Sequence, residues 1–206
     1  RIKLTDKNDT HYIYNFGILN KNNYDNNPEN EIIYESVWDF TGLNFTGDLN
    51  NATPKSNLMT YCNSKQTSNI VTGIVSDGCS MEDINTTGGS IKDSRLVVGN
   101  NENRSIIEFE FNIAVKYVEI YAESYHNVSS TGEISNINKK SAIHVRLKDQ
   151  FIDLSTEEDK VSQKSQKFTY NIEKLDYFSI YTDSNTEKVL IDKIIVGYTQ
   201  IENTLY

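Results

Sequence analysis

The chain has 206 residues, a length that suits one β domain with or without a short extension. It carries 20 Lys and Arg against 29 Asp and Glu, a net charge of −9, and this balance disfavours nucleic acid and anionic membrane surfaces as partners. No apolar run approaches the roughly 18 residues of a transmembrane helix, so membrane insertion is not expected. Thirteen tyrosines against one tryptophan favour strands with half-exposed faces.

The N-terminal part differs in composition from the rest of the chain. Residues 1–30 are polar and rich in asparagine, apart from an apolar patch at 12–19 that predicts one edge strand. The sequence NKNNYDNNPEN that follows the patch is typical of a turn or linker. We therefore expect an N-terminal extension or edge strand over residues 1–30 and the folded domain over 31–206.

Residues 31–45 predict the opening strand of this domain, because Val37, Trp38 and Phe40 are large and apolar. Trp38 is expected in the core, with a tryptophan in a binding site as the alternative. Residues 48–89 have the weakest pattern of the chain, with a possible strand only at 70–75. So long an irregular region in a compact domain is typical of a functional loop or of structure that the pattern does not reveal.

Cys62 and Cys79 are the two cysteines of the chain, and we expect them to form a disulfide. The bridge would close a loop of about 17 residues and contribute roughly 3 kcal/mol. The sequence around both is polar, which disfavours buried free thiols, and two free thiols in a reducing compartment are the alternative. A metal site is disfavoured, because the cysteines lack close spacing and the three histidines are scattered.

The clearest pattern lies in residues 105–122, where two runs of alternating apolar and polar residues follow one another. Successive side chains of a strand point to opposite faces, so each run has one buried and one solvated face. Because about four residues join the runs, they are predicted to form an antiparallel pair of strands. The side chains that this alternation predicts to be buried are Ile107, Phe109, Phe111, Val118, Ile120 and Ala122.

Further short strands are expected on both sides of this pair. They are predicted at residues 94–99, 141–147, 151–154, 168–172, 177–181 and 189–198. The inward side chains expected from them include Ile143, Val145, Phe178 and Ile180. No stretch shows an apolar stripe of helical period, so the sequence predicts an all-β fold, a two-sheet antiparallel β-sandwich of jelly-roll type.

The same alternation predicts a set of outward polar and aromatic side chains. If their strands share a sheet, they form one solvated face with rings for stacking on sugars and with donors for hydroxyl groups. Tyrosine and arginine also dominate protein interfaces, so the face suits either partner. The alternative is ordinary cross-strand pairing that covers the sheet. The predicted ligand-binding residues are Tyr117, Tyr121, His144, Arg146, Tyr177 and Tyr181, with Glu119 beside them.

The opening WDFTGL, the closing VLIDKI and the strand order between them resemble a known pattern. The chain is similar to the β-sandwich accessory domains of secreted bacterial nucleases and surface proteins. It is more distantly similar to jelly-roll carbohydrate-binding modules. The resemblance spans about residues 31–198 and implies a secreted, non-catalytic module at an extracellular or cell-surface location.

Those carbohydrate-binding modules often join their first and last strands through a calcium ion. The acids that match in this chain are Asp39 and Asp192, and carboxylate oxygens are ligands that Ca²⁺ prefers. The chain departs from the pattern at Lys193, where a second acid usually stands. The resemblance therefore implies a possible structural Ca²⁺ at Asp39 and Asp192.

Catalytic motifs are missing from the sequence: it has no GxSxG, HExxH, P-loop or GxGxxG. Glu108 and Glu110 are paired on one strand, but solvated strand faces carry such pairs routinely, so no catalytic residue is predicted and no enzyme is expected. The predicted function is an extracellular binding or adhesion module that recognises a glycan or a protein surface. The alternatives are a structural component of a larger surface assembly and, less favoured, a hydrolase with a polar site in residues 48–89.

Overall fold

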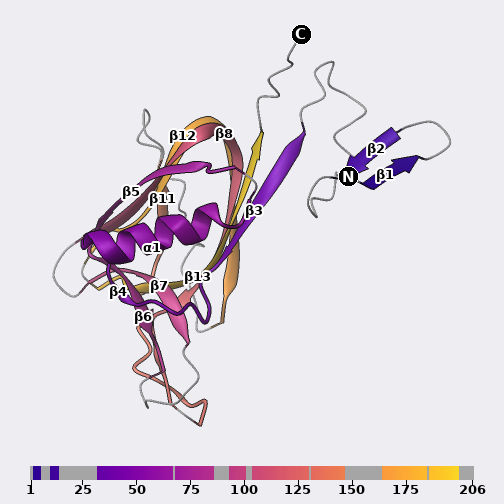
Figure 1. Cartoon of the computed structure of the whole chain (residues 1–206). Coiled ribbons are helices and arrows are strands. Elements are labelled where there is room, and N and C mark those ends of the chain that lie inside the picture. Colours follow the sequence, from indigo (N-terminus) through magenta and orange to yellow (C-terminus); the bar gives the residue numbers. More distant parts are fainter. Residues whose placement is uncertain are drawn as a thin grey trace.

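Antiparallel strands and one helix make up the described part of the chain in the computed structural model (Figure 1). The structure describes residues 2–5, 10–13, 32–66, 68–85, 93–100, 104–129, 131–146, 164–184 and 186–199. The elements are β1 Ile2–Thr5, β2 Thr10–Ile13, β3 Ile33–Asp39, β4 Gly47–Asp48, α1 Ala52–Asn63, β5 Val71–Asp77, β6 Cys79–Asp83, β7 Ser94–Val98, β8 Ser105–Ser124, β9 Asn127–Val128, β10 Ile134–Ser135, β11 His144–Arg146, β12 Gln166–Thr182 and β13 Val189–Thr199.

The all-β class is confirmed, with α1 as the helical exception. Nine strands belong to one curled sheet in the order β11-β12-β8-β13-β7-β6-β4, to which β3 is added at β13 and β5 at β8. The pairs β1–β2 and β9–β10 are separate two-stranded sheets. Because the nine strands form one hydrogen-bonded network, the division into two jelly-roll sheets stays a prediction.

Strand β8 is one continuous strand of 20 residues, so the prediction of two paired strands in this region is wrong. Its buried side chains fall on odd positions from Ser105 to Phe111 and on even positions from Val118 to Ser124. The phase changes in residues 112–117, where the pairing with β12 and β13 also shifts register. A hairpin and a bulged strand can both change which positions, odd or even, carry the buried side chains. In β8 the change comes from a bulge.

Strand β12 joins the two strands predicted at 168–172 and 177–181 into one strand of 17 residues. It pairs with β8 from Gln166↔Ala122 to Thr182↔Ser105, with register shifts on both sides of Leu175. In Figure 1 the two long strands lie side by side and curve together. Their shared bend curls the whole sheet, because the other strands attach to β8 and β12. Strand β11 pairs with β12, and the remaining strands join β8 directly or through β13.

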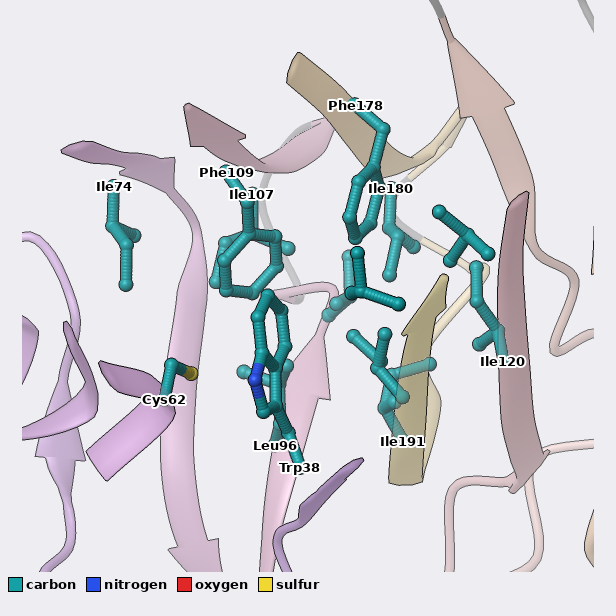
Figure 2. Close-up of a cluster of buried hydrophobic side chains, with 14 of the residues drawn as sticks. Trp38, Cys62, Ile74, Leu96, Ile107, Phe109, Ile120, Phe178, Ile180 and Ile191 are labelled. Atoms are coloured by element: carbon teal, nitrogen blue, oxygen red, sulfur yellow. The ribbon is translucent and has the colours of Figure 1, made fainter. Parts of the chain in front are cut away.

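The inside of the curl holds the core. The side chains predicted for it are buried there: Ile107, Phe109, Phe111, Val118, Ile120, Ala122, Ile143, Val145, Phe178 and Ile180. Trp38 is also buried, as expected, and its Nε1 donates a hydrogen bond to the Ser36 hydroxyl at 2.8 Å. The Trp38 ring lies 5.1 Å from the Phe109 ring, which in turn stacks on Phe178 at 5.3 Å. Figure 2 shows Trp38 pointing toward Phe109 in the middle of this cluster.

Helix α1 lies within the region that the sequence left irregular. Its fully buried side chains are Leu58 and Cys62, a single i, i+4 pair, so the helix has too narrow an apolar stripe to be recognised. Pro54 is compatible with the first turn, because the amide N–H groups there have no partner within the helix. The strand expected at 70–75 is confirmed as β5.

The C-terminal end of α1 forms side-chain hydrogen bonds to two strands of the sheet. The Asn63 amide donates to the Val71 carbonyl at 2.8 Å and accepts the Val71 N–H at 2.9 Å. The Tyr61 hydroxyl donates to the Asp39 carbonyl on β3, and burial together with the Asp39 charge raises the pKa of Tyr61 to about 12. Polar backbone groups of β5 and β3 therefore have hydrogen-bond partners on the helix.

Cys62 and Cys79 are free thiols in the structure, so the predicted disulfide is not supported. Both lie in the core, and burial raises the pKa of each thiol. Their polar neighbours in sequence belong to the outer side of α1 and β6, whereas the cysteines themselves point inward. The two thiols act as small apolar core residues.

Several predictions fall wholly or partly outside the described residues. These are the boundary at residue 30, most of the patch at 12–19, the last residue of the strand at 141–147 and the strand at 151–154; β2 Thr10–Ile13 overlaps the start of the patch. Across the described residues, no helix has the length and apolar character needed to span a membrane.

Removing one core ring tests the assignment of the inner face. Phe109→Ala should lower the free energy of unfolding by about 3–5 kcal/mol, because it leaves a cavity against Trp38 and Phe178. Urea denaturation measures the change. Val75→Ala on β5 is the control, since Val75 is 53% exposed and its truncation should change stability by less than about 0.5 kcal/mol. Equal effects of the two variants would contradict the assignment.

A second variant tests the attachment of α1 to β5. Asn63→Ala removes both hydrogen bonds to Val71 and should cost about 1–3 kcal/mol, since a backbone donor and acceptor lose their partner. The matched control is Asn57→Ala on the exposed side of the same helix, which should leave the urea midpoint nearly unchanged. If Asn63→Ala lowers the unfolding free energy no more than the control does, water molecules satisfy the Val71 backbone groups in place of the Asn63 side chain.

Candidate functional site

The outward side of β3, β13, β8 and β12 carries a mixed aromatic and charged surface, which we call the tyrosine face. The pairing register places its residues in three rows across the four strands. The rows are Glu35–Gly197–Tyr117–Asn171, Val37–Ile195–Glu119–Thr169 and Asp39–Lys193–Tyr121–Lys167. The face therefore contains Tyr117, Glu119 and Tyr121, which the sequence predicted to point outward.

Tyr117 is held in a fixed position on this face. Its ring lies across Gly197 of the neighbouring strand, and a Cβ at Gly197 would collide with the ring. The Tyr117 hydroxyl donates a hydrogen bond to the Glu35 carboxylate, one strand further along the row. Burial, together with the hydrogen bond and charge of Glu35, raises the pKa of Tyr117, so the hydroxyl keeps its proton. The ring thus spans β13 from β8 to β3.

Tyr121 lies four residues further along β8, about 13 Å away by strand geometry. The Lys193 Nζ lies 4.0 Å from the centre of its ring, and the Tyr121 hydroxyl donates to Glu119 at 3.4 Å. Lys167 forms an ion pair with Glu119 at 2.5 Å, and this contact raises the pKa of Lys167. Charges of both signs therefore alternate around the two rings.

Three of the remaining predicted ligand residues lie together at a different place: His144, Arg146 and Tyr181. The His144 ring stacks on Tyr181 with 5.1 Å between ring centres, and the Arg146 guanidinium lies 4.3 Å from the Tyr181 ring. Arg104 lies 4.5 Å from the same ring, which leaves Tyr181 1% exposed. Tyr177 is 5% exposed. The expectation of solvated rings at Tyr177 and Tyr181 is therefore wrong. The alternation of apolar and polar residues predicts on which side of the sheet a side chain lies, but it does not predict whether other side chains cover it there.

The sequence missed a cluster of ionisable side chains, here called the Arg95 cluster, on β7, β8 and β13. The Arg95 Nε lies 2.6 Å from an Asp192 oxygen and 3.9 Å from a Glu123 oxygen, and Asp93 pairs with the same guanidinium. The His126 Nε2 lies 4.0 Å from Glu123. Burial and the charge of Asp192 raise the pKa of Glu123 to about 7. No local pattern joins these residues, because they meet only through long-range strand pairing.

The two acids predicted to bind calcium have other contacts in the structure. Asp39 accepts hydrogen bonds from the Thr41 N–H at 3.0 Å and from the Thr41 hydroxyl at 2.6 Å. Asp192 is the extra residue of a bulge in β13 and pairs with Arg95. Within the described residues, no group of three or more His, Cys, Asp or Glu side chains is placed to hold a metal. Calcium at Asp39 and Asp192 stays a prediction.

Comparison with models of protein families and with curated proteins finds no match. Among solved structures, the chain is similar to a family two carbohydrate esterase from Cellvibrio japonicus, with a TM-score of 0.38 and 12% sequence identity. The similarity covers 62% of this chain and 32% of the esterase chain. Because the match spans about a third of the esterase, the function proposed below rests on the contacts of this chain.

The Arg95 cluster makes stability depend on pH. The pKa of Glu123 is raised to about 7 in the folded chain, whereas the ordinary pKa of about 4.3 applies when the chain is unfolded. The preference of the folded chain for protonated Glu123 therefore stabilises it fully below about pH 4.3, and this stabilisation is lost as the pH rises toward 7. Glu123→Gln cannot lose a proton. The unfolding free energy of the native chain should therefore fall by about 1–2 kcal/mol relative to Glu123→Gln between about pH 4.5 and 7.5.

Urea denaturation of both proteins at each pH measures this difference. Glu133→Gln, which removes an exposed carboxylate, is the control for loss of one negative charge. A difference between the native chain and Glu123→Gln that does not change with pH would refute the raised pKa.

Proposed function

We propose that this chain is a non-catalytic module that binds a glycan through the tyrosine face. The observation that carries the proposal is the Tyr117 ring, which lies across Gly197 and is anchored by Glu35. An aromatic ring offers its face to the apolar C–H surface of a sugar. Since Tyr117 is already fixed, little side-chain freedom is lost when the sugar stacks on it.

The surroundings of the two rings suit an uncharged sugar chain. Glu119 is paired with Lys167, and Lys193 lies over Tyr121, so positive and negative charges offset one another across the face. Thr169 and Asn171 stand beside them in the same rows and add uncharged donors and acceptors for hydroxyl groups. The spacing of about 13 Å between Tyr117 and Tyr121 gives a chain of sugars two points of contact.

The proposal includes the expectations that the sequence resemblance carries. The module is placed outside the cell or on its surface, its curled sheet is taken as a jelly-roll sandwich, and Ca²⁺ at Asp39 and Asp192 is a possible structural ion. These points are supported by the WDFTGL and VLIDKI segments and by the all-β class.

Binding to an array of glycans, followed by titration calorimetry with the best ligand, tests the proposal. Tyr117→Ala should weaken binding about three- to tenfold, as expected for a lost stacking contact. Gly197→Ala should act in the same direction, because the new methyl group displaces the ring while every polar group remains. Tyr125→Ala, just beyond the end of β8, is the control for removal of a half-buried tyrosine elsewhere, since its hydroxyl donates to Glu82 away from the tyrosine face.

Circular dichroism must show that each variant is folded. Unchanged affinity in folded Tyr117→Ala and Gly197→Ala would exclude the tyrosine face as the glycan site.

One observation favours a second function, packing against a protein neighbour in a surface assembly. Val37 on β3 is 41% exposed and lies opposite Ile195 in the middle row of the tyrosine face. A protein partner would bury this apolar pair, whereas a sugar would not need it. Val37→Ser distinguishes the two: it should abolish concentration-dependent association in sedimentation experiments if the face packs on protein, and leave glycan binding intact.

A further inference from the structure

A pocket lies at the end of the curled sheet, away from the rows of the tyrosine face. It has a volume of about 310 Å³ and is formed where the turn before β11 meets the turn between β12 and β13. Its lining residues are Lys139, Lys140, Ser141, Thr186 and Glu187. The volume is at the lower end of the range for small-ligand sites, about 300–1,000 Å³.

The walls of this pocket are tied to each other by hydrogen bonds. The Asn138 amide donates to the Thr186 carbonyl at 2.9 Å, which joins the two turns directly. The Lys140 N–H donates to the Asn138 side chain at 2.9 Å, and the Ser141 hydroxyl donates to the Lys188 carbonyl. The backbone that carries both lysines is therefore fixed before any ligand binds.

The two lysines of the pocket form no ion pair with a described residue, Glu187 of the same pocket included. Lys139 and Lys140 are exposed, and neither lies within ion-pair distance of a described carboxylate, whereas Lys167 and Lys188 both form such pairs. In a chain with a net charge of −9, two adjacent unneutralised ammonium groups are a local exception. They attract a negatively charged group.

The acid in the pocket is committed to other partners. One Glu187 oxygen accepts the Asp183 N–H at 2.7 Å and lies 3.4 Å from the His144 Nε2. This oxygen of Glu187 is thus directed toward Asp183 and His144, which do not line the pocket. The Thr186 hydroxyl forms a hydrogen bond with the Ser184 hydroxyl at 2.9 Å and adds a polar group to the wall.

We propose that this pocket binds a compact oxyanion, a carboxylate, sulfate or phosphate group, between Lys139 and Lys140. Ammonium groups form short charge-assisted hydrogen bonds to such oxygens. The site is independent of the proposed glycan site, because it shares no residue with the tyrosine face. The group can belong to a free inorganic ion or to an acidic sugar, and the two sources are separated by the choice of probe.

The test is an amide NMR titration of the whole chain with sodium sulfate, sodium glucuronate and glucose, with sodium chloride at matched ionic strength. Sulfate or glucuronate should give saturable shifts at residues 138–141 and 186–188, and glucose and chloride should not. Tighter binding of glucuronate than of sulfate assigns the site to an acidic sugar, and the reverse order assigns it to an inorganic or sulfate group.

The double variant K139Q/K140Q should weaken sulfate and glucuronate binding by at least about tenfold, since it removes both charged donors. K55Q/K65Q is the matched control, because it removes the same charge from α1 and the turn that follows it and should keep the affinity. Tyr117→Ala should also keep it, so the two proposed sites fail or succeed separately. Shifts that chloride reproduces, or that persist in K139Q/K140Q, overturn the proposal.

Discussion

The pairing of β8 with three other strands is the constraint on which the rest of the structure depends. One edge of β8 pairs with β12 along nearly its whole length, while the opposite edge pairs first with β5 and then with β13. Because β5 and β13 follow the same edge of one bent strand, the sheet divides and curls there. The bulge at residues 112–117 keeps apolar side chains on the inner side through the bend, and so puts Phe109 and Ile120 into the same core.

This curl also produces the three polar regions on the outside. The tyrosine face lies on the second half of β8 and its neighbours, the Arg95 cluster lies further along the same strands, and the pocket of Lys139 and Lys140 lies at the turn between β12 and β13. Their chemistry differs because their surroundings differ. Tyr117 and Glu35 remain near solvent, whereas Glu123 is enclosed with Asp192 and holds its proton to a higher pH.

Local alternation predicted which side chains are buried, because the period of a strand does not depend on its partner. It could not predict that residues 105–124 form one strand, since a bulge and a hairpin shift the phase alike. Helix α1 was missed because tertiary contacts at Leu58 and Cys62, and not an amphipathic stripe, hold it in place. Tyr117 and Tyr121 were correctly expected together, but the partners that bury Tyr181 and assemble the Arg95 cluster come from distant segments.

The position of β13 has a consequence for how the chain folds. This strand starts at Val189, yet it pairs with β3, β7 and β8, which are separated from it by about 65–150 residues. During synthesis, those three strands emerge long before the strand that bridges them, and they expose unpaired backbone N–H and C=O groups until it arrives. Folding dominated by such distant contacts is slow. Helix α1, which lies early in the chain and binds the Val71 backbone through Asn63, covers part of the edge of β5 through local contacts and can shield it from other chains during the delay.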